Sequence, residues 1–183
     1  KVDAKVKILN SNDSKLATAQ ALANATIGLA KALSKLEPDL VVLLGDRYEI
    51  LAAAQAALIM QIPVAHIAGG DTTEGAFDEA IRHSITKMSH LHFVTNSISA
   101  ARVRQMGENP KSIFNVGSPG IDYLRQLKKL TRPEVEARLK FKFREKNLLV
   151  SFHPETLSKT SPTEQCTELL AALDSVASHD TAI

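Results

Sequence analysis

A short apolar strand that leads into two glycines and then a helix, within residues 63–92, constrains the fold of this chain most strongly. Residues 64–67 have the composition of a buried strand. Gly69 and Gly70 follow, and they allow a backbone turn or a close ligand approach that side chains would block. A helical pattern then begins at about residue 76. Because open α/β sheets bind ligands where strands end and helices begin, we expect a binding site here.

The alternation of strand and helix continues along the whole chain. Further strands are expected at residues 5–9, 40–44, 91–95, 112–116 and 148–152, and helices at residues 16–36, 48–60, 97–106, 121–130 and 164–177. The run LVVLL at residues 40–44 is apolar on both faces, which is typical of a central parallel strand. The pattern predicts an α/β protein with a Rossmann-like, doubly wound parallel sheet.

The chain divides by composition into two parts of unequal length. Residues 1–130 carry most of the alternating pattern, whereas residues 131–147 are highly charged, contain Pro133 and are expected to form a linker or crossover. Residues 148–183 begin a new strand and helix but are too few for a complete domain. We therefore expect an incomplete second domain and a chain that is part of a longer protein.

Composition excludes several classes of partner. The 183 residues are 44% apolar and 23% charged, as in globular proteins. A net charge of +2, 4% aromatic residues and no Trp disfavour nucleic acid. The single Cys166 excludes an internal disulfide framework and favours a reducing, cytoplasmic location. No signal peptide is expected, and the apolar run at residues 50–60 is too short to span a bilayer.

The motif GDRYE at residues 45–49 follows the expected strand at residues 40–44. Asp46 can hold a sugar hydroxyl or take part in proton transfer there. Alternatively it caps the next helix, with Arg47 and Glu49 on the surface. Its position at the end of a strand favours a role in function.

The motif HIAGGDTTEGAFDEAIRH at residues 66–83 is denser in ionisable groups. They are His66, Asp71, Glu74, Asp78, Glu79, Arg82 and His83. Acid–base chemistry at a carbon needs an acid and a base in different environments. Alternatively, Asp78 and Glu79 are first-turn acids that pair with Arg82 and His83. This alternative explains the helix but not the double glycine or Asp71.

Three further motifs have weaker interpretations. His90 and His92 would share one face of a strand, where a structural pair is favoured over a metal site. SFHPE places His153 after a strand, where it can touch a phosphate or simply precede a rigid proline. GSPG, which contains Ser118, can approach a phosphate or form only a turn.

Together the motifs GDRYE, HIAGGDTTEGAFDEAIRH, ITKMSHLHFV, VGSPGID and FHPET resemble the UDP-N-acetylglucosamine 2-epimerase family, and its hydrolysing branch in particular. The likeness covers nearly all of residues 10–160. It implies a GT-B-like pair of Rossmann-like domains, with residues 1–130 as the later part of the first and residues 148–183 as the start of the second, nucleotide-binding one. It also implies a homodimer or homotetramer.

The resemblance implies a reaction that needs neither a redox cofactor nor a metal. UDP is eliminated from a UDP-sugar, and water adds to the glycal to give free N-acetylmannosamine or a related sugar for nonulosonate biosynthesis. The alternatives are a non-hydrolysing 2-epimerase, a hydrolysing epimerase of a UDP-diacetamido-trideoxy sugar, a GT-B glycosyltransferase and a protein that binds sugar nucleotides without catalysis.

The resemblance also assigns roles to single residues. It places Asp46, Asp71, Asp78 and His153 in catalysis. The expected substrate-binding residues are Gly45, Arg47, Glu49, His66, Glu79, Arg82, His83 and Ser118. One departure stands out, because Ala68 occupies a position where many members carry Glu. Asp71, three residues later, is the expected substitute.

Overall fold

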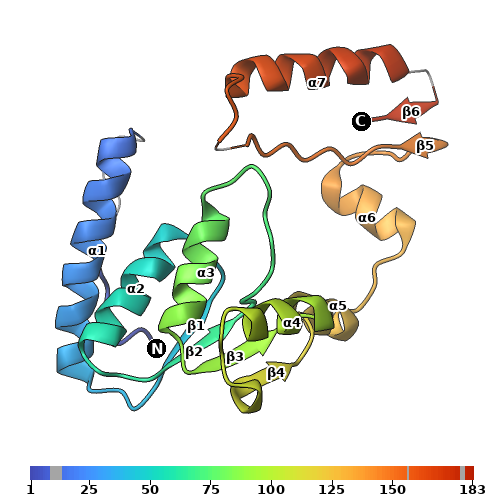
Figure 1. Cartoon of the computed structure of the whole chain (residues 1–183). Coiled ribbons are helices and arrows are strands. Elements are labelled where there is room, and N and C mark those ends of the chain that lie inside the picture. Colours follow the sequence, from blue (N-terminus) through green and yellow to red (C-terminus); the bar gives the residue numbers. More distant parts are fainter. Residues whose placement is uncertain (9–13, 156, 178–179) are drawn as a thin grey trace. The chain divides into compact units, whose positions relative to one another are not determined.

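In the computed structural model, strands and helices alternate along the chain as the pattern predicts (Figure 1). The structure describes residues 1–8, 14–155, 157–177 and 180–183. Internal contacts separate two compact units, Lys1–Ile121 and Asp122–Ile183, and the boundary falls within helix α5, Pro119–Gln126. Each unit has its own sheet, one with four strands and one with two.

The first unit is built on a parallel sheet with the strand order β1-β2-β3-β4 (Figure 1). The strands are β1 (Val41–Leu44), β2 (Val64–Ile67), β3 (Leu91–Val94) and β4 (Ile113–Asn115). In register, Leu43 lies beside His66, and His66 lies beside His92. Because all four strands are parallel, the loops that follow them meet at one edge of the sheet. The predicted parallel α/β sheet is confirmed.

Four helices pack in the first unit. They are α1 (Lys15–Leu36), α2 (Tyr48–Ile59), α3 (Asp78–Met88) and α4 (Ser97–Gln105). Ile85 of α3 is fully buried in a cluster with Leu43 and Val64, while Val103 of α4 packs against Val94. By register these strand residues share one face, so α3 and α4 cover the same side of the sheet. The alanine-rich α2 joins that layer, and α1 packs on α2.

The opposite face of the sheet is also apolar. Val42 and Leu44 of β1 are 59% and 56% exposed there, and Phe93 stacks on Phe114 with ring centroids 5.4 Å apart. A second apolar face fits a sheet that is covered on both sides. However, β1 stands at the end of the strand order among the described residues, so its expected central position is not observed. A run of apolar residues indicates that both faces of a strand can be buried. It does not indicate that the strand has a neighbour on each side.

Other boundaries differ from the prediction because pairing, not apolarity, defines a strand. Residues 5–8 form no strand, and Leu9 lies outside the described residues. In the second unit, residues 148–152 are not a strand; instead β5 (Lys146–Asn147) pairs with β6 (Thr181–Ala182). The helices of this unit, α6 (Arg132–Leu139) and α7 (Pro162–Val176), both begin with a capping box.

A helix that crosses a bilayer needs about 20 mostly apolar residues. Among the described residues, no helix meets this requirement.

Candidate active site

An ion pair between Asp46 and Arg82 joins two elements at the carboxyl edge of the sheet. Asp46 lies in the turn after β1, and Arg82 lies on α3, 36 residues later. The Arg82 side chain is only 9% exposed and the Asp46 side chain 24%. A largely buried guanidinium needs a charged partner, because an unpaired charge away from water is costly. The ion pair therefore holds the turn after β1 against α3 at this edge of the sheet.

Arg82 also holds the loop that follows β2. Its guanidinium donates to the Asp71 carbonyl oxygen at 2.8 Å and to Thr73 Oγ1 at 2.9 Å. The planar guanidinium presents five N–H donors in a fixed fork, so three partners fix its orientation. Arg82 thus connects the turn after β1, the loop after β2 and helix α3.

The Asp71 side chain faces helix α4. Its carboxylate accepts a hydrogen bond from Thr95 Oγ1 at 2.9 Å and another from Ser99 Oγ. A hollow of about 370 Å³ beside it is lined by Asp71, Thr72, Asn96, Ile98, Ser99 and Arg102. Asp71 therefore ties the loop after β2 to the start of α4 with its side chain, while its backbone contacts Arg82.

Asp78 and Glu79 open α3 but differ in their contacts. Glu79 accepts a hydrogen bond from the Thr73 backbone N–H at 3.0 Å and lies 3.7 Å from His83 Nε2. Asp78 is half-buried, and no hydrogen bond engages its carboxylate among the described residues. Of the three aspartates of the predicted site, Asp78 alone has a carboxylate that accepts no hydrogen bond among the described residues, and the charge of Arg47 acts on it.

Arg47 and Glu49 pair with each other beside Asp46. Arg47 donates to Glu49 Oε1 at 2.8 Å and to Oε2 at 3.1 Å. Burial favours the neutral form of Glu49, but the hydrogen bond and charge of Arg47 outweigh it and hold the pKa of Glu49 below its usual value. The Arg47 side chain is exposed, so it is accessible to a ligand at this edge.

His66 and His92 lie side by side beneath the helices, and both are fully buried. His66 was predicted to be among the substrate-binding residues, and in the structure its side chain is fully buried. His92 Nε2 lies 3.3 Å from Glu108 Oε2, without hydrogen-bond geometry. Burial lowers the pKa of both imidazoles below the usual 6.5. The Gly45 carbonyl raises the pKa of His66 and Glu108 raises that of His92, but burial has the larger effect in each case.

These two histidines make stability depend on pH. In the unfolded chain each takes up a proton near its usual pKa of 6.5, whereas in the folded chain it does so only at lower pH. The stability they contribute is therefore complete above that value and is lost as pH falls through the folded pKa values. We expect the free energy of unfolding, measured in urea, to fall between about pH 7.5 and about pH 5.5. The fall is expected to be shallower in His66→Gln and in His92→Gln, and parallel curves for all three proteins would contradict this account.

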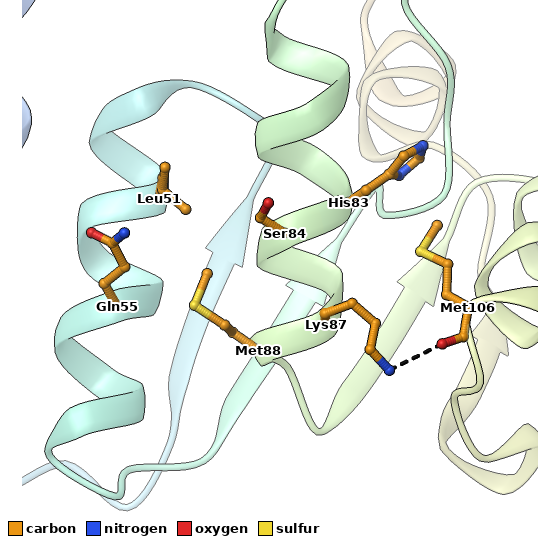
Figure 2. A pocket seen from close by; sticks show the side chains of 7 residues that line it. All are labelled: Leu51, Gln55, His83, Ser84, Lys87, Met88 and Met106. Carbon is orange, nitrogen blue, oxygen red and sulfur yellow. Dashed lines mark hydrogen bonds between the residues drawn. The ribbon is translucent and has the colours of Figure 1, made fainter. Parts of the chain in front are cut away.

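A larger hollow than the one beside Asp71 lies at α2 and α3 (Figure 2). It measures about 740 Å³ and is lined by Leu51, Gln55, His83, Ser84, Lys87, Met88 and Met106. Figure 2 shows Lys87 directed to the Met106 carbonyl oxygen, to which it donates at 3.0 Å. Among the described residues that line this groove there is no carboxylate, whereas the sheet edge carries several, so acid–base chemistry is better placed at that edge.

The last two predicted site residues lie further along the chain. Ser118 is half-buried in the loop that precedes α5. His153 belongs to the second unit, where it is exposed and its Nε2 lies 3.2 Å from Ser151 Oγ. Within the described residues, three or more His, Cys, Asp or Glu side chains do not gather as a metal site would require.

Comparison with known proteins decides the family. The profile of the family described as UDP-N-acetylglucosamine 2-epimerase matches residues 1–182. The chain belongs to this epimerase family. A relative from Campylobacter jejuni, GDP/UDP-N,N′-diacetylbacillosamine 2-epimerase (hydrolyzing), is 39% identical over 176 residues, which are 96% of this chain and 46% of that protein. The Legionella pneumophila UDP-N,N′-diacetylbacillosamine 2-epimerase (hydrolyzing) is 41% identical over 149 residues, 81% of this chain and 39% of that protein.

Solved structures of this epimerase family share the fold. The structure of UDP-GlcNAc 2-epimerase from Neisseria meningitidis bound to UDP-GlcNAc superposes with a TM-score of 0.78 at 24% identity, over 96% of this chain and 49% of that chain. The predicted Rossmann-like fold of a GT-B-like family is thereby confirmed. The chain spans about half the length of the relatives it matches.

Four hydroxyl side chains of the candidate site were not predicted from the sequence. They are Thr73, Thr86, Thr95 and Ser99. Two carried a usable signal: Thr86 follows Arg82 by one helical turn, and Ser99 is the third residue after the helix cap Asn96. Thr73 had a signal only as a possible helix cap, and Thr95 had none, because its partner Asp71 is 24 residues away.

Proposed function

We propose that the protein containing this chain is a hydrolysing 2-epimerase of UDP-activated 2-acetamido sugars. A base removes the C2 proton, UDP leaves from C1 with the C1–O bond electrons, and a C1=C2 glycal forms. Water then adds across the double bond, with the proton returning to the opposite face of C2, and the free 2-epimeric sugar results. The observation that carries the proposal is the set of carboxylates at the sheet edge, in three different environments within a 2-epimerase family.

The environments suggest a division of roles. Asp78 is the proposed base, because its carboxylate accepts no hydrogen bond among the described residues and is half-buried. Asp46, held by Arg82, is proposed to orient a sugar hydroxyl and to keep the guanidinium in place. We give Asp71 a positioning role, because Thr95 and Ser99 occupy its carboxylate. His153 is proposed to act at the diphosphate, as the resemblance implies.

The identity of the sugar is the second part of the proposal. The family description names UDP-N-acetylglucosamine, and the sequence motifs led to the same sugar, with free N-acetylmannosamine as the product. The two hydrolysing relatives described above carry the name of a diacetamido-trideoxy sugar, diacetylbacillosamine, and one matches 96% of this chain. These names favour the diacetamido sugar as the preferred substrate.

Product analysis with the intact protein tests the proposal. UDP-N-acetylglucosamine and the UDP-diacetamido-trideoxy sugar are supplied separately and followed by proton NMR. We expect equal amounts of UDP and free 2-epimeric sugar, with faster turnover of the diacetamido sugar. An epimerised sugar still bound to UDP would indicate the non-hydrolysing alternative. Transfer to an added acceptor sugar would indicate a glycosyltransferase, and binding without turnover would indicate that Ala68 marks a lost active site.

We also propose a cytoplasmic homodimer or homotetramer, which the single cysteine and the resemblance suggest. Sedimentation equilibrium of the intact protein measures the assembly, and a monomer at micromolar concentration would contradict it.

A further inference from the structure

His66 is bonded at both ends of its buried imidazole. Nε2 lies 2.8 Å from the Gly45 carbonyl oxygen, and Nδ1 lies 3.2 Å from Thr86 Oγ1. Both His66 and Thr86 are fully buried in the first unit. The histidine therefore acts on its neighbours in the protein and not on a ligand.

Each end of the imidazole meets one element of the Asp46–Arg82 ion pair. The Gly45 carbonyl belongs to the peptide that leads directly into Asp46. Thr86 lies one turn after Arg82 on α3, and its Oγ1 lies 3.0 Å from the Arg82 carbonyl oxygen. His66, on the strand between these elements, is thus a second connection between the two partners of the ion pair.

The proton arrangement on His66 follows from its partners. A carbonyl oxygen only accepts, so Nε2 carries the proton and donates to Gly45. In the neutral imidazole Nδ1 is then an acceptor, and it shares the single Thr86 hydroxyl proton with the Arg82 carbonyl oxygen, which lies 3.0 Å from Oγ1. Burial, which lowers the pKa of His66, favours this neutral form. The other charged or titratable groups that influence His66 are His92, Arg82 and Asp46.

The double glycine leaves room for this connection. A Cβ on Gly69 would lie 2.8 Å from Thr86 Oγ1 and 2.9 Å from His66 Nδ1, closer than real Cβ contacts allow. A side chain at this position would displace the hydroxyl from the imidazole. Gly69 is therefore explained by the packing of the loop over His66 and Thr86.

We propose that His66, supported by Thr86, is a positioning residue that sets the Asp46–Arg82 ion pair in its catalytic geometry. This inference rests on the proposed epimerase function. An ordinary core histidine stabilises the fold only. For His66 we expect that losing the hydrogen bond to Gly45 lowers turnover more than it lowers the stability of the fold.

Two amide variants separate the two ends of the imidazole. In His66→Gln the side-chain amide reaches the place of Nε2 and can donate to Gly45, whereas in His66→Asn it reaches only the place of Nδ1. We expect His66→Asn to lower kcat about 10- to 100-fold with KM within about threefold, because a misplaced catalytic group slows chemistry more than binding. His66→Gln is expected to stay within about fivefold of the wild type. Thr86→Val is expected to lower kcat, with Thr86→Ser as the matched control that keeps the hydroxyl.

The outcomes distinguish this inference from the proposed function. An active wild type, an inactive Asp46→Asn and equal kcat values in both His66 variants would overturn the positioning role and leave the epimerase function standing. A wild type without epimerisation would refute the proposed function. Crystal structures of both variants test the geometry without catalysis: we expect Arg82 to leave Asp46 in His66→Asn and to stay in His66→Gln. A retained ion pair in His66→Asn overturns the inference, and Thr86→Val against Thr86→Ser decides it if His66→Asn does not fold.

Discussion

Replacing Asp46 by asparagine is expected to reduce the turnover of the intact protein about 10²-fold, because the carboxylate that orients the sugar hydroxyl and the Arg82 guanidinium is lost. The substitution keeps the shape of the side chain and removes its charge. Arg82, whose side chain is 9% exposed, would then lose its only carboxylate partner among the described residues. We expect a loss of about 1–3 kcal/mol of folding stability as well, because the guanidinium remains in a poorly solvated position.

Two further variants show whether charge or geometry matters at this ion pair. Asp39→Asn removes an exposed carboxylate before β1 and serves as the control, with unchanged turnover expected. Arg82→Lys keeps the charge but cannot reach Asp46, the Asp71 carbonyl and Thr73 together, so we expect it to be nearly as inactive as Asp46→Asn. Near-wild-type turnover in Asp46→Asn would remove this residue from the mechanism.

A side chain at Gly70 is expected to cause the largest loss of stability of any small substitution at the site. The residue has a φ of +80°, where L-residues are strained, and a Cβ would lie 2.5 Å from the Ser99 carbonyl oxygen. The first effect costs about 1–2 kcal/mol. Overpacking against a helix backbone, which cannot rotate away, adds about 1–3 kcal/mol. We therefore expect Gly70→Ala to lose about 2–5 kcal/mol.

Gly107→Ala separates strain from overpacking. Gly107 also has a positive φ, +90°, but apart from its chain neighbours no described residue has an atom within 4 Å of the place its Cβ would take. Only the conformational cost of about 1–2 kcal/mol is expected there. Urea unfolding of both variants measures the difference. Equal losses would show that the loop after β2 is not packed against α4 as the structure describes.

The fold was predictable because it follows from local patterns repeated along the chain. Apolar runs, helix caps and Gly or Pro boundaries fix where α2, α3 and α4 begin to within a few residues. The position of β1 in the sheet and the extent of β5 were not predictable in the same way. Both depend on which strands pair, and pairing is decided by segments distant in sequence.

The chemistry of the site was predictable by residue type but not by direction. Asp71 and Asp78 both follow a strand at helix-start positions, yet one faces Thr95 and Ser99 and the other has a carboxylate that accepts no hydrogen bond in the described part of the chain. His66 was predicted to bind substrate, and the structure adds that its side chain is fully buried. The direction of a side chain depends on the partners that the tertiary structure supplies, and a motif does not contain them.

The backbone conformation of Ala68 could not be predicted from the motif. It adopts a left-handed conformation with φ of +64° at the end of β2, and its N–H donates to the Phe93 carbonyl oxygen at 2.9 Å. A left-handed residue other than glycine costs about 1–2 kcal/mol. The sequence showed that this position lacks the Glu of many members, whereas the strained turn appears only in the structure.

If a carboxylate removes the C2 proton while UDP departs, a proton from the solvent must take its place at C2. The intact protein is incubated with the UDP-diacetamido-trideoxy sugar in deuterated water and followed by proton NMR. We expect UDP release together with a free 2-epimeric sugar that carries deuterium at C2. Released sugar that keeps its original C2 proton and configuration would show simple hydrolysis and would contradict the proposed mechanism.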